Sequence, residues 1–100
     1  DKMLKSELYR YRSEIEKICK ETGIKKLMLF GSTLTGDSTP ESDIDLLAEF
    51  EGTRSLFKVI GTKLKFEELL HNEIDLLTPM ALSPYFRDKV LEMAEVIYEA

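Results

Sequence analysis

Residues 27–49 read LMLFGSTLTGDSTPESDIDLLAE, and the rest of the chain can be interpreted around them. An apolar run ends at Gly31-Ser32, a polar segment with a second glycine follows, and another apolar run begins at Asp43-Ile44-Asp45. Apolar runs this short, bounded by glycine and polar residues, predict buried strands rather than helices. We therefore expect two strands, over residues 26–30 and 43–50, joined by a turn and a brief helix that starts at Ser32.

Three longer helices and one more strand are predicted on either side of this stretch. Apolar residues recur every three or four positions over residues 2–21, over residues 54–70 and from residue 84 to the C-terminus, as in amphipathic helices. Residues 73–78 (EIDLLT) predict a third strand, which Pro79 ends. The order α-β-α-β-α-β-α predicts an α+β fold, a small mixed β-sheet flanked by helices.

Composition limits the classes of protein to consider. The chain has 100 residues, of which 43% are hydrophobic, which suits one domain over residues 1–100 with a single core. A net charge of −5 argues against broad, sequence-independent binding of nucleic acid, which needs a basic surface. No apolar run is long enough for a transmembrane helix, so we expect a cytoplasmic protein without membrane contact.

Several single residues have structural interpretations. Cys19, the only cysteine, is expected to be a small buried side chain, and one cysteine excludes an intramolecular disulfide. His71, the only histidine, is expected at an exposed helix end. Basic side chains are expected on the solvated faces of the third and last helices: Arg54, Lys58, Lys63, Lys65, Arg87 and Lys89.

Asp43 and Asp45 are the first candidates for chemistry. Side chains alternate between the two faces of a strand, so these two carboxylates point the same way, with Cα atoms roughly 6.5–7 Å apart. Two like charges held this close are unfavourable without a cation between them. Carboxylates so placed can converge on Mg²⁺, or on a pair of ions about 3.5–4 Å apart that supports in-line phosphoryl displacement.

Asp75 is the third candidate, because residues 74–77 repeat the sequence IDLL of residues 44–47. If the two strands are parallel neighbours in matching register, Asp75 lies beside Asp45 on the same face. A third carboxylate there can bind a metal ion and accept the proton of an attacking hydroxyl.

Gly31 and Ser32 complete the candidate site, where the first strand meets the brief helix. Glycine lets a phosphate approach the backbone closely. Backbone N–H groups at the start of the helix and the Ser32 hydroxyl can donate to phosphate oxygens. The combination predicts donors on one side of a triphosphate and metal-bound carboxylates on the other.

The pattern GSxxxGxxxxxSDIDLL, over residues 31–47, resembles the signature of the minimal nucleotidyltransferases of the DNA polymerase beta superfamily. The resemblance extends over nearly the whole chain, and it implies the polymerase-beta-like palm fold. It assigns Gly31 and Ser32 to nucleotide binding, Asp43 and Asp45 to metal binding, nucleotide binding and catalysis, and Asp75 to the third catalytic, metal-binding carboxylate. Many members neutralise HEPN-family toxins. The resemblance thus implies an antitoxin that uses two Mg²⁺ ions to transfer AMP from ATP to a tyrosine of its partner, blocking the partner's RNase activity.

One departure from the family pattern keeps a second function open. Members often carry a basic or aromatic residue just before the second glycine, in a GSxARG pattern, whereas Thr33-Leu34-Thr35 precede Gly36 here. An arginine able to reach the triphosphate or the partner is absent from that loop. The alternative function is a binding module with little or no catalysis, which neutralises its partner by occlusion.

Overall fold

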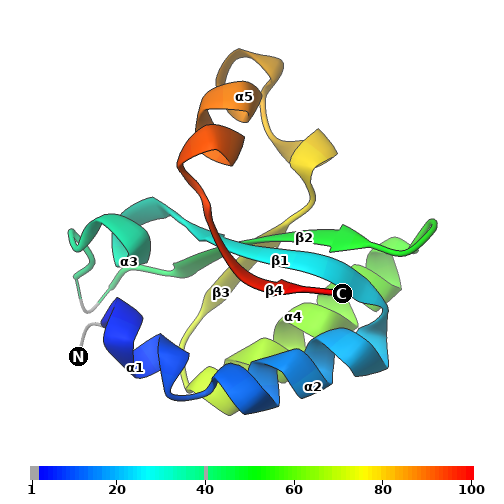
Figure 1. Ribbon diagram of the computed structural model, residues 1–100, viewed down its shortest axis with the longest axis horizontal. Helices are drawn as coiled ribbons and strands as arrows, with labels where there is room; N and C mark the ends of the chain where they lie inside the picture. Colours follow the sequence, from blue (N-terminus) through cyan, green and yellow to red (C-terminus); the bar gives the residue numbers. More distant parts are fainter. Residues whose placement is uncertain (1–2, 40) are drawn as a thin grey trace.

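A four-stranded sheet runs through the centre of the computed structural model, which describes residues 3–39 and 41–100 (Figure 1). The strands are β1 (Ile24–Phe30), β2 (Ile44–Phe50), β3 (Ile74–Leu77) and β4 (Glu95–Glu99), in the spatial order β3-β2-β1-β4. β1 pairs antiparallel with β2 and with β4, whereas β2 and β3 are parallel. The sheet is therefore mixed, as the sequence predicted.

The helices are distributed unequally over the two faces of the sheet. They are α1 (Lys5–Tyr9), α2 (Arg12–Thr22), α3 (Gly31–Thr35), α4 (Leu56–Leu70) and α5 (Pro84–Met93), with a 3₁₀ turn η1 (Pro79–Ala81). Figure 1 shows α2 and α4 along one face and α5 on the opposite side. None of the helices within the described residues has the length and apolar character needed to cross a membrane.

The core lies between the sheet and the pair α2 and α4. Alternate residues of β2, Ile44, Leu46 and Ala48, are fully buried against this layer. Phe66 of α4 and Ile15 of α2 meet them from the helices. Burying one large apolar side chain contributes roughly 1.5–3 kcal/mol, so each of these residues adds substantially to stability. The α+β fold is confirmed.

The helix ends follow local sequence signals. Gly23 ends α2 in the left-handed region (φ 77°), a position that favours glycine. Ser55 and Ser83 cap α4 and α5, each accepting a hydrogen bond from a backbone N–H of the first turn. His71 ends α4 in a left-handed conformation (φ 51°) and is exposed, as expected.

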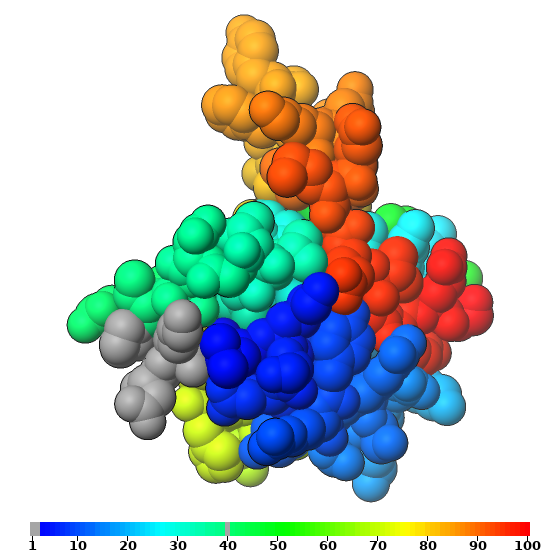
Figure 2. Space-filling view, turned by 60° about the vertical axis from the view of Figure 1, so that its left-hand side comes forward, coloured from blue at the N-terminus to red at the C-terminus, as the bar shows by residue number. Residues whose placement is uncertain are grey.

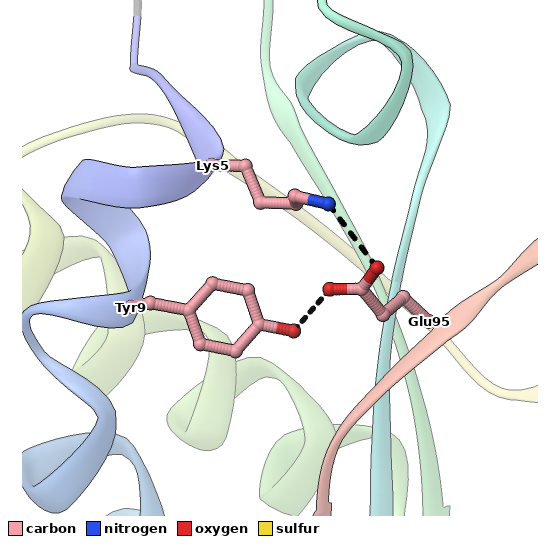
Figure 3. A network of polar contacts seen from close by, with 3 residues as sticks. All are labelled: Lys5, Tyr9 and Glu95. Atoms are coloured by element: carbon pink, nitrogen blue, oxygen red, sulfur yellow. Dashed lines mark hydrogen bonds and ion pairs between the residues drawn. The ribbon is translucent and has the colours of Figure 1, made fainter.

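The predicted N-terminal helix is divided at Arg10–Tyr11 into α1 and α2. The division turns α1 toward β4, where Lys5 forms an ion pair with Glu95 (3.2 Å) and the Tyr9 hydroxyl donates to the same carboxylate (Figure 3). These contacts attach α1 to the far end of the chain. A periodicity of apolar residues cannot reveal the division, because Leu8 and Ile15 stay buried on both sides of it.

The prediction of a helix to the C-terminus was wrong beyond Met93. Ala94 is extended (φ −65°, ψ 144°), and residues 95–99 form β4 along the free edge of β1. Val96, Ile97 and Tyr98 are good strand formers, and Ile97 is fully buried in the core. Pairing satisfies the backbone groups that β1 would otherwise leave unpaired, and this favours a strand over the last turns of a helix.

Candidate active site

Asp45 and Asp75 lie side by side on the open face of the sheet. The parallel pair β2–β3 aligns the repeated segments residue for residue, including Asp45 with Asp75. Neighbouring strands lie about 4.8 Å apart, so the two carboxylates start from adjacent backbone positions. Ile44 and Ile74 are buried against the helices, which leaves both acids on the opposite face. The predicted register is confirmed.

Asp43 directly precedes β2 and is exposed, whereas Asp45 is partly buried. The pKa of Asp45 is raised to about 6, first by burial and then by the negative charges of Asp75 and Asp43 and a side-chain hydrogen bond with Asp75. Asp75 and Asp43 therefore both lie close enough to act on the Asp45 carboxyl. A cation bound among them would relieve the unfavourable charge that gathers at Asp45.

Gly31 lies directly against Asp45. It begins α3 immediately after β1, with φ 75°, and the preceding residue, Phe30, pairs with Asp45 across the sheet. A Cβ at position 31 would overlap Oδ2 of Asp45 and lie 2.9 Å from its Cγ. The backbone of the predicted phosphate turn and the metal-binding strand thus meet at a contact that only glycine permits.

The Ser32 side chain is partly buried at the start of α3, beside this contact. Its carbonyl accepts hydrogen bonds from the N–H groups of Gly36 and Asp37, which close the turn. To the described residues, its hydroxyl makes no hydrogen bond, so that group remains able to donate to a ligand. A contact of this turn with phosphate stays a prediction.

The loop before Asp43 is held by residues whose structural role the sequence analysis missed. The Ser42 hydroxyl accepts from the backbone N–H of Thr39 (2.9 Å) and lies 3.1 Å from the Thr39 hydroxyl. The buried Ser38 hydroxyl donates to the carbonyl of Met3. Ser and Thr residues three positions apart in a loop often form turns closed by their side chains. The spacing of Thr39 and Ser42 in the sequence could therefore have indicated this turn.

Thr35 occupies the position of the basic residue found in many family members. Its hydroxyl lies 3.1 Å from a carboxylate oxygen of Asp37 and 3.4 Å from the carbonyl of Ser32. Thr33 is buried. The loop between the two glycines therefore supplies no cation, as the sequence indicated.

The donor atoms suit Mg²⁺, which prefers carboxylate oxygens and retains several of its own waters. Across residues 3–39 and 41–100, however, no three His, Cys, Asp or Glu side chains are grouped as a complete metal site. The assignment of Asp43, Asp45 and Asp75 as metal ligands stays a prediction.

Comparison with known proteins places this site in a family. The model of the family described as "Polymerase beta, Nucleotidyltransferase" matches residues 13–100, which include all five candidate residues. The chain belongs to this family. It is a nucleotidyltransferase, and the resemblance noted from residues 31–47 is confirmed.

Two curated relatives have names that specify the group transferred. A protein of Methanocaldococcus jannaschii, provisionally named a protein adenylyltransferase, is 36% identical over 72 residues, which are 72% of this chain and 77% of the relative. The protein adenylyltransferase MntA of Thermococcus cleftensis is 34% identical over 76 residues, which are 76% of this chain and 75% of the relative.

Solved structures confirm the nucleotidyltransferase fold. A structure provisionally described as a minimal nucleotidyltransferase matches with a TM-score of 0.80 and 33% identity, over 92% of this chain and 94% of the other. The MNT antitoxin in a complex with the tri-AMPylated HEPN toxin of Shewanella oneidensis matches with a TM-score of 0.68, over 91% of this chain and 71% of the other. At 17% identity, the second match shows the fold alone.

Proposed function

We propose that this nucleotidyltransferase uses Mg²⁺ to transfer AMP from ATP to a hydroxyl, expected to be that of a tyrosine, on a HEPN-family toxin in the cytoplasm, and so acts as an antitoxin. The observation that carries the proposal is the alignment of Asp45 with Asp75 beside Gly31. The names of the two adenylyltransferase relatives support AMP as the transferred group. The complex of an MNT antitoxin with an AMPylated HEPN toxin supports the class of partner.

In the proposed reaction, the acceptor oxygen bonds to the α-phosphorus of ATP, and the bond to the departing pyrophosphate breaks. Asp43 and Asp45 would hold Mg²⁺, which supplies positive charge to the phosphates and stabilises the departing pyrophosphate. Asp75 completes the site and accepts the proton of the acceptor hydroxyl. The amide groups at Gly31 and the Ser32 hydroxyl hold phosphate oxygens in place.

Substitution of the acids tests this proposal. Asp43→Asn and Asp45→Asn should each lower the transfer of AMP from radiolabelled ATP to the purified HEPN protein by at least about 100-fold. Neither should lower the free energy of unfolding, because each removes a charge from a repelling group. Glu41→Gln, in an exposed acid two residues before Asp43, is the matched control and should keep full transfer. Full labelling of the HEPN protein by an Asp43, Asp45 double variant would refute the proposal.

The alternative, neutralisation by occlusion, is favoured by one observation: Thr35 stands where many members carry a basic residue. Mass spectrometry of the HEPN protein co-expressed with this chain separates the two functions. An added mass of AMP that disappears with the Asp43 variant supports transfer. A tight complex in which the partner is unmodified supports occlusion.

A further inference from the structure

A groove lies on the helical side of the sheet, at the end away from the candidate active site. It opens where the end of α2 meets the first half of α4, two helices that pack against each other. Figure 1 shows both of these helix ends on the side away from α3, whereas Figure 2 brings α1 and the α3 segment to the near face. Gly23 and Gly31 flank the two ends of β1, so roughly 25 Å of strand separates the groove from the predicted phosphate turn.

Positive charge is concentrated in this groove, although the whole chain carries a net charge of −5. The groove has a volume of about 690 Å³, which is in the range of small-molecule sites. Four basic side chains and one acid, Glu21, line it: Lys20, Arg54, Lys58 and Lys65. Within residues 3–39 and 41–100, none of the four forms an ion pair. We call this site the basic groove; charge of one sign in a concave surface focuses its field and attracts anions.

Arg54 is held in place in the wall of the basic groove. Its guanidinium lies against the backbone of Gly23, where a Cβ would overlap one terminal nitrogen and lie 3.2 Å from Cζ. The same group stands over the ring of Phe50, 5.9 Å from the ring centre. The sequence predicted Arg54 on the solvated face of the third helix, whereas it is partly buried and precedes α4. Arg54 thus presents a positioned positive charge that no carboxylate of the described residues neutralises.

Gly61 lines the same groove from the middle of α4. Glycine is among the least favourable residues in a helix interior. No contact within the described residues requires glycine here, because its φ is not positive and a Cβ would meet no atom within 4 Å. A glycine that weakens its helix and borders open space suits a ligand that approaches the helix backbone closely.

We propose that the basic groove binds a small ligand that carries a chain of phosphate groups, separately from the candidate active site. Lys and Arg side chains without a carboxylate partner are well suited to phosphate oxygens. The four cations come from α2, from α4 and from the loop before α4, which suits several linked phosphates better than a single one. The start of α4, capped by Ser55, lies in the same groove and also favours negative charge.

Two sources of this chemistry differ in their use of Phe57. A nucleoside triphosphate adds a base, which can stack on Phe57, a groove residue that is 88% exposed. Inorganic tripolyphosphate supplies the phosphates alone. A nucleic acid is a less suitable ligand, because the groove is confined to two helix ends and the acidic remainder of the chain repels an extended polyanion.

The test adds ATP or tripolyphosphate to the whole chain without Mg²⁺, because the acids of the other site repel phosphates when no cation is present. Amide NMR spectra of the isotope-labelled chain then locate each ligand. Both ligands should shift the signals of Gly23, Phe57 and Gly61 and leave those of Gly31 and Ser32 in place. Shifts confined to Gly31 and Ser32, or no shifts at millimolar ligand, would overturn the proposal.

Paired substitutions on the same two helices test the role of charge. Lys20→Gln with Lys58→Gln removes two cations from the groove. The matched control, Lys17→Gln with Lys63→Gln, removes two cations from α2 and α4 that do not line it. Calorimetry should show that the groove variant binds tripolyphosphate at least about tenfold more weakly than the original chain, while the control binds it nearly as well. Thermal unfolding checks that both variants are folded. Equal weakening in both would overturn the proposal, because net charge alone would then explain the binding.

The two ligands also identify the source of the phosphates. Equal affinities would support the proposal and assign the groove to the phosphate chain alone. Tighter binding of ATP that Phe57→Ser reduces to the level of tripolyphosphate would support it and assign the groove to a nucleotide. A single-stranded RNA oligomer that shifts the same amide signals, when neither ATP nor tripolyphosphate does, would overturn the proposal in favour of a nucleic-acid surface.

Discussion

The contact between Gly31 and Asp45 leads to a prediction with a built-in control. Replacing Gly31 by Ala places a Cβ at a position with φ 75°, a left-handed conformation that costs about 1–2 kcal/mol for a residue with a side chain. The same Cβ overlaps Oδ2 of Asp45 and must displace that carboxylate. Gly36→Ala imposes a similar backbone cost, because its φ is 88°, but its Cβ would meet nothing within 4 Å.

Both variants should therefore lose about 1–2 kcal/mol of stability, which corresponds to a fall in Tm of roughly 4–16 °C for a domain of this size. Only Gly31→Ala should also lose nucleotide binding, with the affinity for ATP·Mg²⁺ measured by calorimetry falling at least about tenfold, because Asp45 no longer occupies its place. Unchanged affinity in Gly31→Ala would refute the reasoning. Equal losses of affinity in both variants would show that backbone strain, rather than displacement of Asp45, is responsible.

Three further predictions concern the core, the pH dependence of stability and the cysteine. Phe66→Ala should lower the free energy of unfolding in urea by about 3–5 kcal/mol, because Phe66 is fully buried, whereas Phe57→Ala on the exposed side of the same helix should change it by less than about 0.5 kcal/mol. The hydrogen bond from Tyr9 lowers the pKa of Glu95, so ionised Glu95 stabilises the folded state above the ordinary pKa of a glutamate. This contribution to the free energy of unfolding is lost as the pH falls through the lowered pKa. In Tyr9→Phe, the free energy of unfolding should therefore fall less on acidification. Burial raises the pKa of the Cys19 thiol to about 12, so almost no thiolate is present in the folded protein at pH 8. A thiol reagent should then modify Cys19 only as fast as the protein unfolds. Rapid modification of the folded protein would contradict this.

The placement of the candidate site residues was predictable because its signals are local. Alternation along a strand was expected to place Asp43 and Asp45 on one face, and the structure puts Asp45 within β2 and Asp43 directly before it. The repeated IDLL segment added Asp75, and the parallel register of β2 and β3 confirmed its place beside Asp45. Gly31 was predicted for its tolerance of a close approach, although the sequence does not show that the approaching group is Asp45 itself.

The C-terminal region was predicted less well because its pattern fits two structures. The stripe at Phe86, Val90 and Met93 continues to Ile97 with helical spacing, yet Ile97 belongs to a strand. The free edge of β1 decides between them, since β4 pairs with it and buries Ile97. That edge is formed by residues about 70 positions away, which no local pattern reports.

The sequence by itself determined β1, β2 and β3, the glycine turn and the family, because short apolar runs, turn residues and a short motif act over a few positions. Only the tertiary structure decided which surfaces face solvent. It placed β4 at the edge of the sheet, carried residues 78–94 from one edge of the sheet to the other and left the stripe of α5 uncovered. Burial depends on what packs against a residue from elsewhere in the chain, so the same apolar spacing forms a core in α2 and an exposed surface in α5.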